Sequence, residues 1–317
     1  GYAITAWFIY IISSKIQFES VKETLASANL ALWLGLGLPC MFIAYVLRIT
    51  CWWLMLRALN VGTRWSHTAG PFMASIALNN LLPFRAGDAV RAFAFSNQLG
   101  TRSSQVLGTI LIQRLQDTLT LLLLLAIGLK ASAIINIPHD LTANIYIISI
   151  LALSATAGII LLAKPAASCI GYLKKRFARF ESPLEKLGAF VDSLKILRNI
   201  KVLLPLSILG ILSWSAEGGI YWASAEALGI EIPWSIALVS LALSTLSTLI
   251  PSSPGYVGTF HFFCSLSLEL TGVDATSALA YAVLVHALLW AASTLVGLFY
   301  WNKSSRLERS LASATES

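Results

Sequence analysis

The chain has 317 residues, of which 57% are apolar and only 12% are charged. Soluble proteins carry about 25% charged residues, so this composition excludes an ordinary soluble domain and predicts an integral membrane protein. The net charge of +7 is concentrated between residues 164 and 201. That pattern favours the cytoplasmic face of a membrane and its anionic lipid headgroups over nucleic acid as a partner.

Apolar segments follow one another along the chain, and their lengths separate them into two groups. Six are predicted to cross the membrane: 2–14, 30–57, 104–130, 141–163, 202–228 and 275–301. Four shorter ones flank two breaks rich in proline and glycine: 67–82 with 86–98, and 233–250 with 255–271. Each pair is predicted to form a re-entrant helical hairpin, because irregular backbone at membrane depth needs protein or a wet cavity to satisfy its polar groups.

The two breaks resemble each other in sequence at an offset of 168 residues. Residues 81–88 read Leu-Leu-Pro-Phe-Arg-Ala-Gly-Asp, and residues 249–256 read Leu-Ile-Pro-Ser-Ser-Pro-Gly-Tyr. This repeat predicts two related cores, at 67–130 and 233–301, within one transmembrane domain that occupies 1–317. Three crossings separate the hairpins, so they are predicted to open to opposite faces as an inverted repeat. The expected fold is an all-α integral membrane protein.

The distribution of charge predicts the topology. With the amino terminus inside, the basic loops fall in the cytoplasm and the loops poor in lysine and arginine fall outside. No basic region precedes the first apolar segment, which disfavours a signal peptide there. Segment 165–200 lacks a spanning stretch, and its apolar residues at helical spacing predict amphipathic helices on the inner surface. We expect a multi-pass protein of the inner (plasma) membrane with both termini in the cytoplasm.

The first break holds the densest polar cluster in an apolar setting. Pro83 ends one half-helix there, and the next half-helix begins with unpaired N–H groups at the positive end of its dipole. Backbone donors, dipole and arginine together suit a phosphate. The alternative is that the charged side chains only pair with one another and pin the loop. The candidate binding residues are Asn80, Arg85, Gly87, Asp88 and Arg91.

Three further charged residues lie inside predicted spans. Arg114 and Asp117 are three residues apart on one helix, and therefore share a face. Glu217 lies in the middle of its span. Charges at such depth usually face the bundle interior, which makes all three candidates for the site, although a purely structural ion pair is the alternative. Glu217 is expected either to be protonated or to pair with Arg48, Arg85 or Arg114.

At the second break, hydroxyl groups and glycines replace the charges. They can bind an anion at a helix N-terminus or simply satisfy the broken backbone. The candidates are Ser252, Ser253, Gly255, Tyr256 and Gly258. Two histidines nearby, His261 and His286, could respond to pH or serve a structural role. We find no catalytic motif, metal-spaced set or nucleotide-binding loop, and expect no cofactor. The four cysteines have no paired spacing and are expected to be free thiols.

Three motif blocks, at 80–91, 113–117 and 251–259, resemble the lysylphosphatidylglycerol synthase transmembrane-region family and occur in its order. The likeness covers nearly the whole chain from about residue 30. Asp88 and Gln113 stand where the family more often carries glutamate. The resemblance implies lipid translocation. We see no aminoacyl-transferase domain in these residues, and expect no lipid aminoacylation by them.

The expected function is therefore that of a flippase, not an enzyme, for an anionic or aminoacylated phospholipid or a polyprenyl-phosphate-type lipid. Arg85 and Arg91 would hold the phosphate, while Asp88, Asp117 and Glu217 orient these arginines. Movement would be downhill or coupled to an ion gradient. The alternatives are a membrane-embedded transferase and a scaffold for a separate synthase. Expected partners are the lipid substrate, anionic headgroups, and such a synthase or a second copy of the chain.

Overall fold

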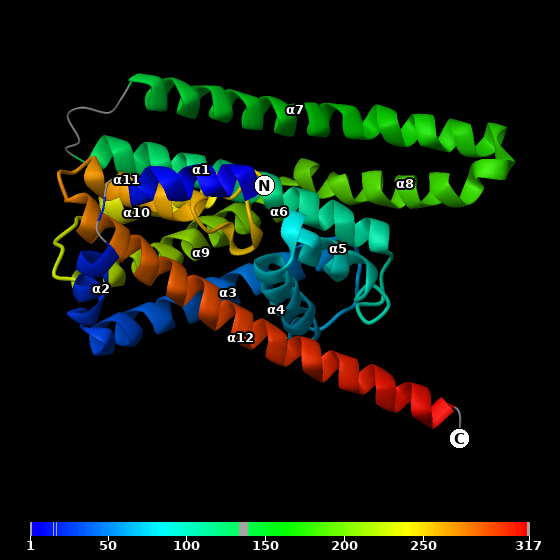
Figure 1. Ribbon diagram of the computed structural model, residues 1–317. Coiled ribbons are helices and arrows are strands. Elements are labelled where there is room, and N and C mark those ends of the chain that lie inside the picture. Colours follow the sequence, from blue (N-terminus) through cyan, green and yellow to red (C-terminus); the bar gives the residue numbers. More distant parts are fainter. Residues whose placement is uncertain (1, 15, 17, 133–138, 316–317) are drawn as a thin grey trace. The chain divides into compact units, whose positions relative to one another are not determined.

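The computed structural model describes residues 2–14, 16, 18–132 and 139–315, and within the helices it gives no side-chain surroundings for 139–146, 178 and 304–315. All regular structure in these ranges is helical (Figure 1). The α-helices are α1 (Tyr2–Ser13), α2 (Phe18–Ala26), α3 (Leu30–Ala58), α4 (Trp65–Leu81), α5 (Ala86–Phe93), α6 (Ser103–Ala131), α7 (His139–Arg176), α8 (Glu181–Ser193), α9 (Ile200–Ala227), α10 (Trp234–Ser247), α11 (Thr259–Glu269) and α12 (Ala275–Thr315). Short 3₁₀ turns are η1 (Pro83–Arg85), η2 (Ala178–Phe180), η3 (Leu194–Arg198) and η4 (Pro254–Tyr256).

Five helices of the described residues are long and apolar enough to cross a membrane. They are α3, α6, α9, residues Ile147–Arg176 of α7 and residues Ala275–Lys303 of α12. The shortest of these spans has 28 residues, and at about 1.5 Å per residue it exceeds the hydrocarbon thickness of about 30 Å. The chain is therefore an all-α multi-pass membrane protein.

Two expected segments differ from the observed helices. The crossing predicted at 2–14 forms α1, which has 12 residues and is shorter than the roughly 20 residues that a span requires. The first of the surface helices predicted at 165–200 is instead the end of α7, which continues through Pro165 to Arg176. Alanines on both sides of Pro165 favour the helix. Only α8 is a separate helix.

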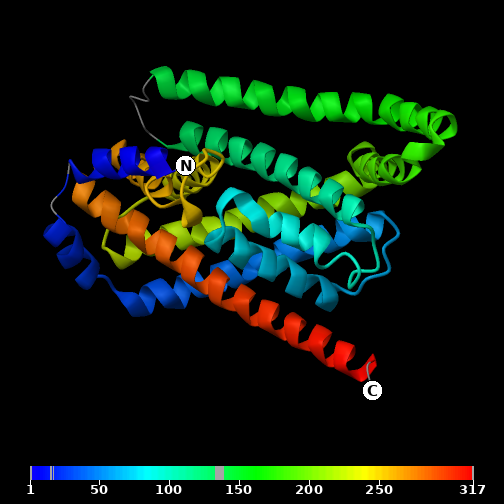
Figure 2. The ribbon, with the colours of Figure 1, turned by 45° about the vertical axis from the view of Figure 1, so that its right-hand side comes forward.

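Both predicted breaks are present, and each joins two helices that pack together. Helix α4 packs on α5, and α10 packs on α11; α4 and α5 lie side by side in both ribbon views (Figure 2). Each break contains a proline followed by two residues of positive φ: Phe84 (56°) and Arg85 (54°), then Gly255 (71°) and Tyr256 (58°). The backbone thus matches Pro83 to Pro254, three residues beyond the proline that the sequence repeat pairs with it. The inverted repeat and the re-entrant path stay predictions.

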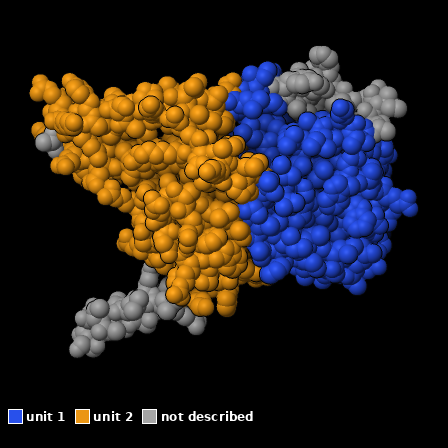
Figure 3. All heavy atoms as spheres, turned by 180° about the vertical axis from the view of Figure 1, so that it is seen from behind, with its two compact units in different colours: residues 1–48, 116–153, 208–290 blue, residues 49–115, 154–207, 291–317 orange. Residues whose placement is uncertain are grey.

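The chain forms two compact units (Figure 3). Each unit contains one of these two helix pairs. Unit 1 comprises residues 1–48, 116–153 and 208–290 and holds α10 and α11. Unit 2 comprises residues 49–115, 154–207 and 291–317 and holds α4 and α5. In unit 2, a Cβ on Gly87 of α5 would collide with the backbone carbonyl of Ser75 in α4. Glycine is therefore required for the close packing of these two helices.

Candidate functional site

A buried ionic cluster forms where α5 meets α4 and α6 in unit 2. Its centre is Asp88, in the first turn of α5. One carboxylate oxygen accepts from Arg91 Nη2 at 3.2 Å, and the other accepts from Arg114 Nε and Nη2 at 3.2 and 2.7 Å. We call these residues, with Asn79 and Gln113, the Asp88 cluster. Asp88 and Arg91 pair across one helical turn, as in the structural alternative raised for this break, and Arg114 joins them.

Asn79 of α4 ties the start of α5 to this cluster. Its amide nitrogen donates to Asp88 Oδ1 at 3.1 Å, and its amide oxygen accepts from the backbone N–H of Asp88 at 3.2 Å. It thereby satisfies one of the N–H groups that the first turn of a helix leaves without an intrahelical partner. The sequence prediction named Asn80, which instead donates to Ser293 and Thr294 of α12 at 3.0 and 2.9 Å.

The two arginines of the cluster differ in exposure. Arg91 is only 1% exposed. Its guanidinium lies 4.8 Å from the ring of Trp52 and 5.2 Å from that of Phe72, and its Nη1 donates to Gln113 at 3.2 Å. Such contacts compensate a buried cation and hold it in place. The side chain of Arg114 is 31% exposed, so it is the cation of this pair that a ligand can reach.

The turn between α4 and α5 is strained. Phe84 and Arg85 both have left-handed backbone, which costs a residue other than glycine roughly 1–2 kcal/mol. Phe84 is also 90% exposed, as suits an apolar side chain that meets lipid and not water. Arg85 is partly exposed and precedes the first residue of α5. Strain of this kind, retained beside a charged cluster, points to a functional constraint on the turn.

A second ionic cluster lies in unit 1. Arg48 of α3 donates from Nη1 to Glu217 of α9 at 2.5 Å, and its guanidinium stacks 3.9 Å from the ring of Trp214. Trp214 in turn donates from its indole nitrogen to Asp117 at 3.0 Å. We call these residues, with Tyr45, the Arg48 cluster. Of the partners considered for Glu217, the structure selects Arg48. The sequence signal for Arg48 was a charged residue in the interior of the apolar segment 30–57, whose other charged residue, Arg57, is its last.

The second break is held by local hydrogen bonds. Ser253 donates its backbone N–H to Thr5 of α1 at 2.9 Å, and Ser252 accepts from the hydroxyl of Thr259 at 3.2 Å. His286 Nε2 lies 2.8 Å from the carbonyl oxygen of Gly255. Thr5 and His286 thus contact interrupted backbone, whereas the Ser252 hydroxyl bonds another hydroxyl and the buried Ser253 hydroxyl has no hydrogen-bond partner among the described residues.

Two further candidates at this break have backbone that shapes the turn. Tyr256 adopts a left-handed conformation with a φ of 58°, and Gly258 has a φ of 88°. A Cβ on Gly258 would lie 3.1 Å from the carbonyl oxygen of Thr5 in α1. Gly258 is therefore needed both for its conformation and for the approach of α1.

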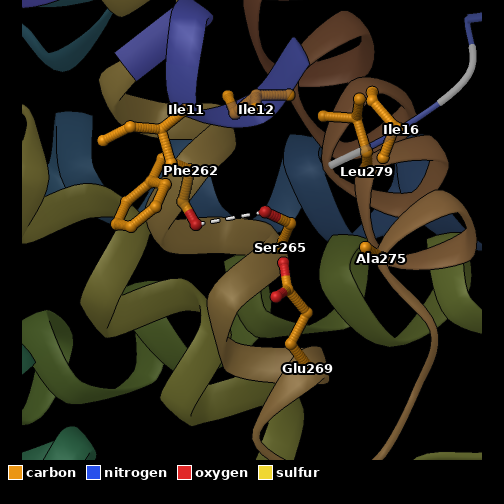
Figure 4. A pocket seen from close by; sticks show the side chains of 8 residues that line it. All are labelled: Ile11, Ile12, Ile16, Phe262, Ser265, Glu269, Ala275 and Leu279. Atoms are coloured by element: carbon orange, nitrogen blue, oxygen red, sulfur yellow. Dashed lines mark hydrogen bonds between the residues drawn. The ribbon is translucent and has the colours of Figure 1, made fainter. Parts of the chain in front are cut away.

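One small cavity opens between α1, α11 and the start of α12 (Figure 4). Its empty space of about 260 Å³ includes open solvent, so the enclosed part is well below the roughly 300–1,000 Å³ of typical ligand sites. It is lined by Ile11, Ile12, Ile16, Phe262, Ser265, Glu269, Ala275 and Leu279. None of the candidate residues lines it. Among the described residues, no group of three or more His, Cys, Asp or Glu could hold a metal ion.

Apolar spanning helices, two broken hairpins and buried arginine–carboxylate clusters define a multi-pass membrane protein with charged groups inside its helix packing. The family described as the lysylphosphatidylglycerol synthase TM region matches residues 1–297, and the chain belongs to this family, as its motifs predicted. It is also 25% identical over 228 residues to the UPF0104 membrane protein MJ1078 of Methanocaldococcus jannaschii, across 70% of this chain and 93% of that protein.

Proposed function

We propose that the protein moves an anionic lipid between the two leaflets of the inner (plasma) membrane. The observation that carries this proposal is the Asp88 cluster, in which two arginines bind a single carboxylate and one of them, Arg114, is 31% exposed. Arg114 donates from Nε and Nη2 to that carboxylate, and an anion that reaches this guanidinium can accept the same paired hydrogen bonds. A phosphate diester offers two oxygens in that arrangement.

The cluster also supplies a reason why the lipid would be released. Asp88 competes with the phosphate for Arg114, so binding exchanges one anion for another and is not excessively tight. Arg91 acts as a positioning residue, because it is buried and keeps Asp88 and Gln113 in place. Arg85, at the strained turn, would add a second accessible cation. The substrate class is an anionic or aminoacylated phospholipid, or a polyprenyl-phosphate-type lipid.

The positively charged segment 164–201 supports a topology in which both termini are cytoplasmic. Its exposed cations are Lys164, Lys175, Arg176, Arg179, Lys186, Lys195, Arg198 and Lys201. Phe177 and Phe180 are exposed among them. Cations interleaved with aromatic rings suit the headgroup region of an anionic leaflet, and lysine and arginine accumulate on the cytoplasmic side of membrane proteins.

Reconstitution into liposomes with a panel of labelled lipids tests the proposal. Wild-type protein should accelerate leaflet exchange of an anionic lipid without forming a product. Arg114→Lys should impair exchange, because lysine keeps the charge but lacks the planar fork. The matched control is Arg102→Lys, at an exposed ion pair with Glu185 at 2.8 Å. Exchange no faster than in empty liposomes would refute the proposal, and formation of a new lipid would instead indicate a transferase.

A further inference from the structure

Arg48 has a guanidinium whose hydrogen bonds are incomplete. Its Nη1 donates to Glu217, whereas its Nε and Nη2 atoms are buried and hydrogen-bond to no group of the residues that the structure describes. Nε and Nη2 form the edge of a guanidinium that binds two oxygens of one phosphate or carboxylate. In Arg114 the same two atoms both donate to Asp88. In Arg48, the corresponding edge formed by Nε and Nη2 therefore has no acceptor among the described residues.

The surroundings of Arg48 hold it in position without supplying those acceptors. Its guanidinium lies between Trp214, at 3.9 Å, and Tyr45, at 5.6 Å from the ring centres. Aromatic faces stabilise the charge but accept no strong hydrogen bond. Buried donors without acceptors are rare in proteins because each has lost its hydrogen bonds to water and gained none in return. A ligand that offers two oxygens would remove this cost.

The charges around Arg48 constrain what can bind there. Facing the Arg48–Glu217 pair are Tyr45 of α3, Asp117 of α6 and Tyr221 of α9. The carboxylate of Glu217 already compensates the Arg48 guanidinium, so an additional anion would place excess negative charge in a buried site. A proton bound to one carboxylate would offset that charge. Glu217 is the suitable acceptor, because it is 4% exposed and holds Arg48 through one oxygen.

We propose that Arg48 binds the phosphate group of an anionic lipid through Nε and Nη2, and that Glu217 takes up one proton in the same step. This inference rests on the proposed function and identifies the coupling ion as the proton. The proton comes from water on the more acidic side and forms an O–H bond on the Glu217 carboxylate, while Arg48 keeps its charge. Release of the lipid returns the proton and restores the Arg48–Glu217 pair.

Calorimetric titration of the full chain, in a neutral detergent, with dioctanoyl phosphatidylglycerol tests this linkage. The phosphodiester of this probe keeps its charge throughout the pH range, so any proton taken up belongs to the protein. Repeating the titration in buffers of different ionisation enthalpy counts these protons. Wild-type protein should take up about one proton per lipid, and its affinity should fall about tenfold for each unit that the pH rises.

Three variants separate the roles of the two residues. Glu217→Gln should bind the lipid without proton uptake and with an affinity that does not depend on pH. Arg48→Lys should weaken binding roughly tenfold or more, because the paired donors are lost while the charge remains. The matched control is Arg57→Lys. Arg57 is an exposed arginine of the same helix, and its guanidinium carbon lies 5.6 Å from the centre of the Trp53 ring. This substitution should leave binding unchanged.

The outcomes distinguish this inference from the proposed function. Lipid binding without proton uptake, or uptake that persists in Glu217→Gln, overturns the inference and leaves the proposed function standing. The same holds if Arg114→Lys abolishes binding while Arg48→Lys has no effect. If the wild-type chain binds no probe at any pH, the inference fails, and the liposome exchange assay decides separately on the proposed function.

Discussion

Asp88 compensates two cations at once, so neutralising it should destabilise the protein more than the loss of either arginine contact. In Asp88→Asn, the 1%-exposed Arg91 and the 31%-exposed Arg114 both lose their ion pair with Asp88. Removing one partner of a buried pair costs about 3–5 kcal/mol, and the partial exposure of Arg114 favours the lower end of that range. Arg114→Gln alone should cost about 1 kcal/mol, because Asp88 keeps its bonds to Arg91 and Asn79.

The double change Asp88→Asn/Arg114→Gln gives the decisive measurement. It removes both members of the 2.7 Å contact. The loss of unfolding free energy in the double variant should therefore be smaller, by about 1–2 kcal/mol, than the sum of the losses in the two single variants. Unfolding in mixed micelles, followed by tryptophan fluorescence, measures all variants. The control pair, Arg102→Gln with Glu185→Gln, has 59% and 47% exposed side chains, and should show a coupling below about 0.5 kcal/mol. Additive losses at Asp88 and Arg114 would refute this account of the cluster.

The remaining predictions concern packing, topology and pH. Gly87→Ala should lower the free energy of unfolding by about 1–3 kcal/mol because the new methyl group meets α4, whereas Gly35→Ala, with nothing within 4 Å, should be tolerated; equal effects would contradict the packing argument. Lys186 of α8 is exposed and lies outside the candidate spans, so an impermeant maleimide should label Lys186→Cys in inside-out vesicles and not in intact cells, and labelling of intact cells would refute the cytoplasmic assignment. Hydrogen bonds from the backbone N–H and hydroxyl of Ser277 hold the pKa of Asp274, just before α12, below its usual range. Because the folded-state pKa is the lower one, Asp274 stabilises the fold above its unfolded pKa, and this stabilisation is lost as the pH falls through the folded value. Asp274→Asn should therefore reduce the acid sensitivity of thermal unfolding, and an unchanged pH profile would contradict this role.

Several features were readable from the amino-acid sequence because they depend on residues close together in the chain. Composition and segment length determined the membrane class, and the proline- and glycine-containing segments predicted where the helices break. Asp88 and Arg91 are three residues apart, so their contact on one helical turn follows from helix geometry. These inferences use only local backbone geometry and the cost of placing polar groups in lipid.

Tertiary structure decided which distant side chains meet. Arg114 is 26 residues from Asp88, and Arg48 is 169 residues from Glu217. Neither partner follows from spacing, because it depends on how each helix is rotated against its neighbours. The same reason explains why Asn79 and not Asn80 contacts Asp88, since adjacent residues on α4 point about 100° apart. The end of α7 likewise continues as a helix where polarity alone predicted a new element. Local sequence thus determined which helices carry charged residues, and helix packing determined which of these residues pair with one another.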